Sequence, residues 1–287
     1  MISTSFEYTR ATSLDDALAK LGAANGEAKL IAGGHSLIPV MKLRLSQPGA
    51  LIDIARIPEL RGIRKADGKI EIGAGTVHHD VASSAMLRQE CPLIAETAAS
   101  IGDAQVRNRG TLGGSIAHAD PSADYPATLL ALDAEINIKG PKGSRSVPAQ
   151  QFFRGLFTVD LAADEIIVSV RFAPVKTAAY AKLYQRASHF AIVGVAAALD
   201  LSGGVIRSAR VGVTGAGPNA TRLTQVEAAL AGKQPSAATF EQASRLADAG
   251  LDDVNSDLHA SAEYRRAMVR VFTKRALTGA VARATAP

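Results

Sequence analysis

Two adjacent glycines interrupt an apolar stretch near the start of the chain, in KLIAGGHSLIPVMKLRLS at residues 29–46. Glycine reaches positive φ and carries no Cβ, so the backbone at Gly33-Gly34 can turn sharply and approach a ligand, with its N–H groups free to bind an anion. Ser36 adds a hydroxyl donor. This pattern predicts an anion-binding loop, although a plain tight turn explains it equally well.

The same combination of glycines and hydroxyls recurs in RNRGTLGGSIAHADPSADYPA at residues 107–127. Gly110-Thr111 and Gly113-Gly114-Ser115 repeat the device, and Asp120 and Asp124 follow. Two such loops in one domain could hold two parts of one long phosphorylated ligand. A dinucleotide offers a pyrophosphate to the amides and ribose hydroxyls to a carboxylate. The two stretches together favour shared binding of a ligand of this kind.

Other motifs carry weaker signals. The stretch GAGPNA at 215–220 formally fits the G-x-G-x-x-G/A fingerprint, but Pro218 interrupts the turn and no carboxylate follows at a strand end about 20 residues on. We therefore interpret it as a structural turn. His78-His79 and the pair His118 and Asp120 suggest a metal site only weakly, because adjacent histidines point in different directions and no further ligand has a suitable spacing.

The composition is that of a globular protein, with 47% apolar and 21% charged residues among 287. No stretch approaches the ~18 apolar residues of a membrane span. The start, MISTSFEYTR, lacks the basic and apolar regions of a signal peptide, so none is expected. Cys91 is the only cysteine. It leaves this chain without a disulfide framework, a zinc ribbon or a cysteine-held iron–sulfur cluster.

The net charge of +5 comes from the last third of the chain. Residues 1–177 carry 19 basic and 19 acidic side chains, whereas residues 178–287 carry 13 and 8. Aromatic residues make up only 5% of the chain and do not interleave with these charges, so nucleic-acid binding is not expected.

Much of the excess lies in EYRRAMVRVFTKRAL at 263–277, which is predicted to be helical. One face is basic, and we interpret it either as solvated or as a docking surface for a partner. It consists of Arg266, Arg270 and Lys274. The opposite, apolar stripe is expected to face the core, and it consists of Tyr264, Ala267, Met268 and Val271.

Several periodic segments must position the two loops. A capping box at Ser13 starts a helix over 12–22, and 28–34 is a buried strand that runs into the first loop. A helix starting near Pro39 and a strand over 50–55 complete a small α/β unit of about 58 residues.

The rest of the chain changes character once. Between 59 and 177 we expect a strand and turn at 68–84, a helix over 91–106 and a closing strand at 164–172. Beyond a boundary near 176–178, long strands joined by a Ser-Gly-Gly turn precede two or three helices. The predicted architecture is α+β, with a two-lobed N-terminal domain over 1–177 (lobes 1–58 and 59–177) and a smaller domain over 178–287.

The segments 32–63 and 101–127, which hold both glycine motifs, resemble the FAD-binding medium subunits of molybdenum hydroxylases. That family includes aerobic carbon monoxide dehydrogenase, quinoline oxidoreductase and the flavin domain of xanthine dehydrogenase. The stretch YAKLYQRASHFAIVGVAA at 180–197 is similar to the start of its C-terminal domain. The resemblance covers nearly the whole chain and implies a two-lobed FAD-binding domain of the vanillyl-alcohol-oxidase (PCMH) type. A carbon monoxide dehydrogenase flavoprotein C-terminal domain would follow.

The resemblance also implies which residues bind FAD. The pyrophosphate would be wrapped by two loops, Asp124 would lie near the ribitol or ribose, Thr76 beside the cofactor, Lys182 near the flavin ring, and Phe190 against the isoalloxazine. The two loops comprise Ala32, Gly33, Gly34, His35, Ser36 and Leu37, and then Gly110, Thr111, Gly113, Gly114 and Ser115.

One departure from the family pattern is Ser188-His189-Phe190, where well-known carbon monoxide dehydrogenases have Gly-Asp followed by Tyr or Trp. Phenylalanine can stack on a flavin but has no polar group to hold a partner. A core role for Phe190 is the alternative. The departure leaves carbon monoxide, an aldehyde, a purine and an N-heterocycle open as the primary substrate, and quinone, NAD or oxygen open as the acceptor.

The lone cysteine and the resemblance together imply a division of labour. This chain would relay electrons through FAD, while the 2Fe–2S clusters lie in a small partner subunit and the molybdopterin in a large one, in a cytoplasmic dimer of heterotrimers. No catalytic residue and no metal ligand is assigned, and peripheral membrane contact stays open. The alternatives are a self-sufficient FAD-dependent oxidase or reductase of the same fold, and a non-catalytic scaffold subunit.

Overall fold

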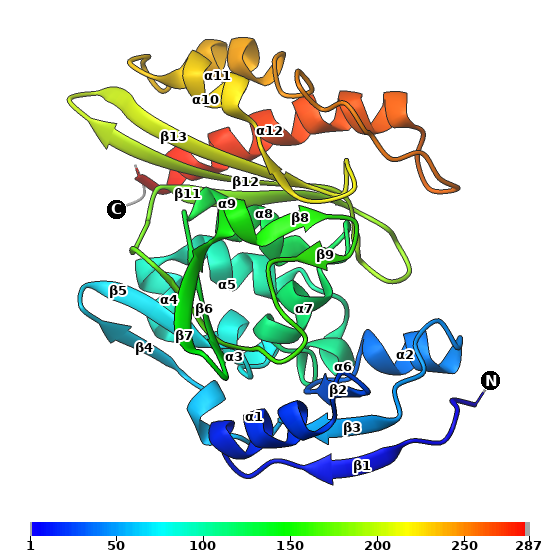
Figure 1. Cartoon of the computed structure of the whole chain (residues 1–287). Helices are drawn as coiled ribbons and strands as arrows, with labels where there is room; N and C mark the ends of the chain where they lie inside the picture. The colour runs from blue at the N-terminus through cyan, green and yellow to red at the C-terminus, as the bar shows by residue number, and fades with distance from the viewer. Residues whose placement is uncertain (1, 285–287) are drawn as a thin grey trace.

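The first glycine loop leaves the edge of a small parallel sheet at the N-terminal end of the molecule (Figure 1). The computed structural model of the chain describes residues 2–284. The sheet has the order β1-β3-β2, with both pairs parallel, and two helices connect its strands. Its elements are β1 (Glu7–Arg10), α1 (Leu14–Ala23), β2 (Ala28–Ile31), α2 (Leu37–Lys42) and β3 (Ala50–Asp53).

Helix α1 begins where the sequence predicts. The Ser13 hydroxyl accepts a hydrogen bond from the Asp16 amide at 3.1 Å. The Asp16 carboxylate accepts from the Thr12 amide at 2.8 Å, one residue before the N-cap that a reciprocal capping box would reach. Leu14, Ala17 and Leu21 form its buried face, so the helix packs against the strands that lead into the glycine loop.

An antiparallel sheet of five strands forms the middle of the molecule, in the order β4-β5-β10-β6-β7. Strand β10 joins two cores. Ile167, Val170 and Phe172 belong to the core shared with the helices, whereas Ile166 packs into the core of the N-terminal sheet. The strands are β4 (Ile63–Ala66), β5 (Lys69–Gly73), β6 (Glu135–Gly140), β7 (Gly143–Pro148) and β10 (Ile166–Phe172).

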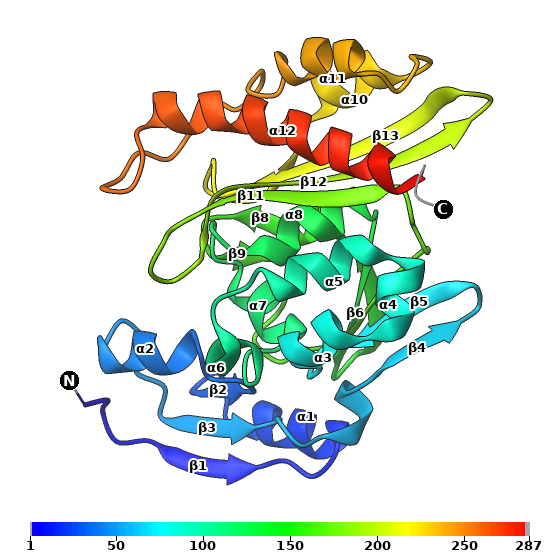
Figure 2. The same ribbon diagram turned by 180° about the vertical axis from the view of Figure 1, so that it is seen from behind.

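Short helices pack against this sheet and carry the second glycine stretch on their connections (Figure 2). They are α3 (His78–Ser83), α4 (Ala85–Glu90), α5 (Pro92–Ala99), α6 (Ala104–Arg107), α7 (Leu112–His118), α8 (Asp124–Ala131) and α9 (Ala149–Phe152). The turn η1 (Pro58–Leu60) precedes the sheet, and the hairpin of β8 (Phe153–Gly155) and β9 (Thr158–Val159) follows α9.

The single helix predicted over 91–106 is wrong, because the chain breaks between α5 and α6. Gly102 has φ of 49°, and an added Cβ would lie 2.8 Å from the Val106 side chain. Asp103 then caps α6 by accepting from the Val106 amide at 2.8 Å. The strand predicted over 50–55 is also shorter and ends at Asp53. The break at Gly102 turns the backbone toward the cavity described below.

The C-terminal part is an antiparallel sheet of order β11-β12-β13-β14 between two sets of helices. The long helix α12 lies along one face, and α5 and α8 of the preceding region cover the other (Figures 1 and 2). The elements are β11 (Ala178–Tyr184), β12 (Ala191–Ser202), β13 (Val205–Thr214), β14 (Thr221–Arg222), α10 (Thr224–Leu230), α11 (Ala237–Ser244) and α12 (Ala262–Ala284). The predicted Ser-Gly-Gly turn joins β12 to β13.

The apolar stripe predicted for α12 is wrong at three of its four residues, and only Met268 packs against the core. Tyr264 and Val271 are 47% and 37% exposed, while the buried face carries an arginine. That face consists of Arg265, Val269, Phe272, Thr273, Ala276, Leu277 and Ala280. Hydropathy alone misplaces it, because the guanidinium of Arg265 finds buried acceptors.

The basic face predicted for α12 is engaged within the chain. Arg270 forms a bidentate pair with Asp248, with N–O distances of 2.6 and 2.7 Å. Lys274 bonds Glu241 on α11 at 2.6 Å. Much of this charge therefore holds α12 against α11 and the loop that follows it.

Arg265 should be among the most costly arginines to remove. Its side chain is 2% exposed and donates to the carbonyls of Ile192 and Gly215 at 2.6 and 2.8 Å and to Asp257 at 2.7 Å. Arg265→Ala leaves the two carbonyls without this donor and removes the ion pair with Asp257, so we expect a loss of about 3 kcal/mol in unfolding free energy, measured by far-UV circular dichroism in denaturant.

The neighbouring Arg266 is the matched control, since its guanidinium reaches only two carbonyls at 3.4 Å. Arg266→Ala should change the unfolding free energy by about 0.5 kcal/mol or less. Equal losses in the two variants would refute the assignment of Arg265 as the anchor of α12.

Candidate functional site

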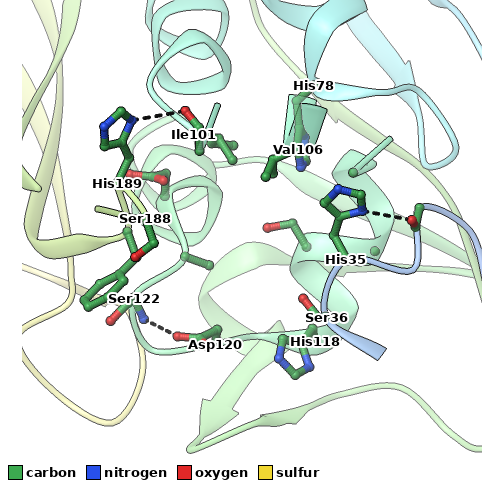
Figure 3. Close-up of a pocket in the computed structure, with 18 of the residues that line it drawn as sticks. His35, Ser36, His78, Ile101, Val106, His118, Asp120, Ser122, Ser188 and His189 are labelled. Atoms are coloured by element: carbon green, nitrogen blue, oxygen red, sulfur yellow. Dashed lines mark hydrogen bonds between the residues drawn. The ribbon is translucent and has the colours of Figure 1, made fainter. Parts of the chain in front are cut away.

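The two glycine stretches meet in one cavity of about 510 Å³ between the N-terminal sheet, the helical region and the C-terminal domain. Residues 33–36 form one wall, residues between 101 and 124 form a second, and Ser188, His189 and Phe190 close it from the C-terminal domain. Figure 3 shows these side chains around the opening. Loops more than 70 residues apart in the chain therefore share one site, as the paired motifs predict.

The first loop presents unused backbone donors. The amides of residues 33–36 make no hydrogen bond to any other residue in the described range. Gly34 has φ of 72°, and the His35 ring lies 3.1 Å from the Gly33 carbonyl. Consecutive free N–H groups of this kind form a concave anion site. The free amides are consistent with the nest predicted from the sequence, and their binding of an anion stays a prediction.

The second loop uses most of its amides within the protein. Thr111 caps α7 by accepting from the Gly114 amide at 3.1 Å. The amides of Leu112 and Gly113 donate to the carbonyls of Thr76 and Ala74 at 3.0 and 2.7 Å. The groups that remain toward the cavity are Gly110, Gly114 and the Ser115 side chain. This loop therefore contributes shape and a hydroxyl more than free amides.

The two loops touch at a point where a side chain has no room. A Cβ added to Gly33 would lie 2.2 Å from the Arg109 carbonyl oxygen and 2.8 Å from the Gly110 Cα. Since real Cβ atoms essentially never approach that closely, glycine at position 33 is what lets the loops form a continuous wall. Gly33 is therefore needed for the contact between the two loops, in addition to any role in ligand binding.

A buried ion pair joins the cavity to the C-terminal domain. Asp124, at the start of α8, is 4% exposed and binds Lys182 of β11 at 2.8 Å and the Tyr180 hydroxyl at 2.6 Å. Lys182 also donates to the Ser100 carbonyl at 3.1 Å. Burial raises the pKa of Asp124, and Lys182 and Tyr180 oppose that shift. Asp124 and Lys182 thus set the position of one wall.

The loop from the C-terminal domain is held by one amide side chain. Gln185 Oε1 accepts from the amides of Ala187 and Ser188, both at 2.8 Å. His189 adopts φ of 62°, and its ring lies 3.2 Å from the Gly102 carbonyl. Phe190 lines the cavity and packs edge-on against His259, with ring centroids 5.3 Å apart. The departure at 188–190 therefore lies on the cavity wall.

His78 lies at the back of the same wall and is 4% exposed. Its Nδ1 is 3.2 Å from the Tyr125 hydroxyl. Burial, with His35 and Arg107 nearby, lowers the pKa of His78 to about 4. The imidazole is therefore neutral at pH 7.

Not every predicted residue reaches the cavity. Nine of them line it: Gly33, Gly34, His35, Ser36, Gly110, Gly114, Ser115, Asp124 and Phe190. The others stand behind the wall or beside it: Ala32, Leu37, Thr76, Thr111, Gly113 and Lys182. The Thr76 hydroxyl accepts from the Gly62 amide at 3.0 Å and donates to the Gly62 carbonyl at 3.2 Å. The Thr76 carbonyl accepts from the Leu112 amide, so Thr76 supports the second loop through its backbone.

Several residues of the wall are not predicted from the sequence. The sequence indicates His78 and His118 only as weak metal-ligand candidates, and it places Gly102 inside a helix. A glycine in the middle of a helical pattern, followed by the capping residue Asp103, was the available signal for the break at this position. Among residues 2–284, no group of three or more His, Cys, Asp or Glu side chains is placed to hold a metal ion.

The fingerprint at 215–220 lies elsewhere. It connects β13 to β14, so a strand and not a helix comes directly after it. Gly215, with φ of 81°, packs so that an added Cβ would lie 2.6 Å from the Ile192 carbonyl. The stretch is a structural turn, in line with the interpretation from sequence.

Comparison with known families matches both parts of the chain. Residues 4–174 match the FAD binding domain in molybdopterin dehydrogenase, and residues 178–280 match the CO dehydrogenase flavoprotein C-terminal domain. The chain is similar to the carbon monoxide dehydrogenase medium chain of Hydrogenophaga pseudoflava, at 43% identity over 99% of both chains. It is 38% identical to the 6-hydroxypseudooxynicotine dehydrogenase complex subunit alpha of Paenarthrobacter nicotinovorans, over 98% of this chain and 96% of that one.

Solved structures agree. The fold matches a chain of Hydrogenophaga pseudoflava carbon monoxide dehydrogenase with a TM-score of 0.94, at 43% identity over 99% of both chains. It matches quinoline 2-oxidoreductase from Pseudomonas putida 86 with a TM-score of 0.92, at 32% identity over 98% of this chain and 99% of that one. The fold is thus that of a flavoprotein component of an oxidoreductase. The chain belongs to the family of FAD-binding medium subunits of molybdenum hydroxylases, and its cofactor is FAD.

The cavity fits that cofactor. Free amides at residues 33–36 suit a pyrophosphate, since consecutive backbone N–H groups bind phosphate oxygens. The Ser36 and Ser115 hydroxyls on the facing loops add donors. Phe190 offers an apolar ring on the C-terminal side.

Replacing Gly33 by alanine tests the contact between the loops. Because the added Cβ would lie 2.2 Å from the Arg109 carbonyl, the loops must separate. We expect loss of most of the bound FAD and destabilisation by about 1–3 kcal/mol. FAD per protein is measured by absorbance after denaturation, and stability by thermal unfolding.

The same change at Gly22 is the control, because a Cβ there has nothing within 4 Å and helix α1 favours alanine. Gly22→Ala should keep FAD and gain roughly 0.5–1 kcal/mol. Full FAD occupancy and an unchanged melting temperature in Gly33→Ala would contradict the close approach.

The lowered pKa of His78 predicts a pH-dependent stability. Its folded-state pKa of about 4 lies below the ordinary value of 6.5, so the unfolded chain takes up this proton first as the pH falls. The contribution of neutral His78 to the unfolding free energy is complete above pH ~6.5 and is progressively lost toward pH ~4. The loss between pH 7 and 4.5 amounts to roughly 2.5 kcal/mol. Unfolding free energies of the flavin-free protein should show this slope in the wild type and a shallower one in His78→Gln. Parallel pH profiles would refute it.

Proposed function

We propose that this chain is the electron-transfer subunit of a heteromeric molybdenum hydroxylase, and that it passes electrons from iron–sulfur clusters of a partner subunit through FAD to an external acceptor. FAD supplies the exchange between one- and two-electron steps when it is bound. The supporting observation is a cavity with four free amides and two facing hydroxyls, built in a chain whose single cysteine, Cys91, is buried.

In this proposal the residues of the wall bind and orient FAD. The amides of 33–36 hold the pyrophosphate, Ser115 adds a hydroxyl from the second loop, and Phe190 covers one face of the flavin. Asp124, with Lys182 and Tyr180, fixes the wall that positions the ribityl or ribose part. The domain boundary near 176–178 separates the FAD-binding part from the part that closes the cavity.

The relay function is favoured over a self-sufficient oxidase by the state of the histidines on the wall. An oxidase needs an acid or base held close to the flavin. His35 and His189 each have Nδ1 against a backbone carbonyl, at 3.1 and 3.2 Å, and His78 has Nδ1 against the Tyr125 hydroxyl. The fourth histidine of the wall, His118, packs against the Phe157 ring. Three of the four imidazoles thus have one ring nitrogen engaged by the protein.

The names of the relatives support partner subunits. They are the medium chain of carbon monoxide dehydrogenase, a subunit of a 6-hydroxypseudooxynicotine dehydrogenase complex and the medium chain of a glyceraldehyde dehydrogenase. We propose a small iron–sulfur subunit and a large molybdenum subunit, assembled as a dimer of heterotrimers in the cytoplasm. Within residues 2–284, no helix is both long enough and apolar enough to cross a bilayer. Relatives named for different substrates leave the primary substrate unassigned.

Anaerobic reduction of the flavin tests the relay. The isolated chain should be yellow, release FAD on denaturation, and stay oxidised with carbon monoxide, aldehydes, purines or N-heterocycles. In the complex with both partner subunits, the correct substrate should bleach the flavin band. Bleaching in the isolated chain would favour the oxidase, and a flavin that stays oxidised in a substrate-turning complex would favour a scaffold.

A further inference from the structure

The pair formed by His78 and Tyr125 leaves one ring nitrogen without a partner. Tyr125 is fully buried, and within the described chain its hydroxyl bonds only to His78 Nδ1, at 3.2 Å. His78 Nε2 makes no hydrogen bond to any residue between 2 and 284, although the side chain is 96% buried. His78 lines the cavity, on the same side as His35 in Figure 3.

The pairing decides which nitrogen of His78 carries the proton. A buried hydroxyl proton needs an acceptor, and Nδ1 is the acceptor available to Tyr125. The Tyr125 hydroxyl stays protonated, because burial and the nearby Asp124 raise its pKa. Tyr125 therefore donates to Nδ1, and the neutral ring carries its own proton on Nε2. The result is a single N–H donor without net charge.

That donor lies where the two glycine loops meet. A Cβ added to Gly110 would be 2.6 Å from His78 Nε2, and one added to Gly33 would be 2.8 Å from the Gly110 Cα. The amides of 33–36, which have no protein partner in the described range, belong to the same junction. An N–H donor that lines the cavity and has no partner within the described residues is available to a ligand bound there.

We propose that His78, held as the Nε2–H tautomer by Tyr125, donates a hydrogen bond to a pyrophosphate oxygen of FAD, and that Tyr125 is the positioning residue for this contact. The inference rests on the proposal that this cavity holds FAD. A neutral donor suits the site, because a cationic imidazole would have to be desolvated beside His35 and Arg107. Gly110 is then the residue whose missing side chain leaves Nε2 accessible.

Titration of FAD into protein freed of flavin tests the contact, with ADP as a second ligand that carries the pyrophosphate without the flavin. His78→Phe should raise the Kd of FAD about 10- to 100-fold, as expected for a lost hydrogen bond to a charged group, and weaken ADP by a similar factor. His78→Gln restores an N–H near the position of Nε2 and should stay within about fivefold of the wild type. His79→Phe, at an exposed neighbour, should change neither ligand.

Tyr125→Phe separates positioning from packing. It removes only the hydroxyl, so it should weaken FAD in the wild-type background and have no further effect on the Kd in the His78→Phe background. Imidazole ¹⁵N spectra of the wild type at pH 7 should show His78 protonated at Nε2, and Tyr125→Phe should lose that preference. This readout does not depend on whether the His78→Phe variant folds.

An unchanged Kd of FAD in His78→Phe, or a ring protonated at Nδ1 in the wild type, would overturn the proposal. Weakened FAD with unaffected ADP would refute the pyrophosphate as the acceptor. If the cavity were not the FAD site, Gly33→Ala would retain FAD, and this outcome distinguishes an error in the site from an error in the His78 contact. If Gly33→Ala loses FAD and His78→Phe does not, the cavity stands and the contact is refuted.

Discussion

The absence of a side chain at Gly33 is the constraint on which the site depends. Its Cα faces the Arg109 carbonyl so closely that even one carbon atom would collide with it. This approach brings the loop after β2 against the loop before α7, and the cavity exists because the two are joined there. The two loops differ in how their amides are used. The amides of the loop after β2 have no protein partner among residues 2–284, whereas most of those of the second loop are bound by the cap of α7 and by backbone carbonyls.

The C-terminal domain completes the site through polar contacts with a few backbone segments. Thr214 donates to the carbonyls of Pro121 and Ala123 at 2.9 and 2.8 Å, and the buried pair of Asp124 and Lys182 lies beside them. A buried ion pair adds little net stability compared with apolar packing, but breaking it is costly. The pair joins α8 to β11, the strand that leads into the loop carrying Phe190.

The sequence predicted those features that neighbouring residues determine, such as helix caps and glycine turns. The cap at Ser13, the glycine turn between β12 and β13 and the pairing of the two glycine stretches could all be read from neighbouring residues. The break at Gly102 also had a local signal, a glycine followed by the capping residue Asp103. The buried face of α12 had none, because a tertiary contact decides it: the carbonyls of Ile192 and Gly215 accept from Arg265.

The same limit applies to the site residues. Motif position identified glycines and hydroxyls on the wall, but it could not show that the Thr76 hydroxyl is used by Gly62 or that Lys182 is bound by Asp124. Nor does spacing reveal that His78 and Tyr125, 47 residues apart, share a hydrogen bond. Such pairings arise only when separate elements pack together.

The cavity wall draws on three parts of the chain, namely the loop after β2, the helical region and the loop before β12. FAD can make all of its contacts only while these three parts are packed together. Binding of FAD is therefore thermodynamically linked to folding of the chain. Saturation at 100 times the Kd would add about 2.7 kcal/mol to stability by mass action. The supply of flavin in the cell would thus set how long the subunit survives proteolysis before it is assembled, and a shortage of flavin would lower the amount of the protein along with its activity.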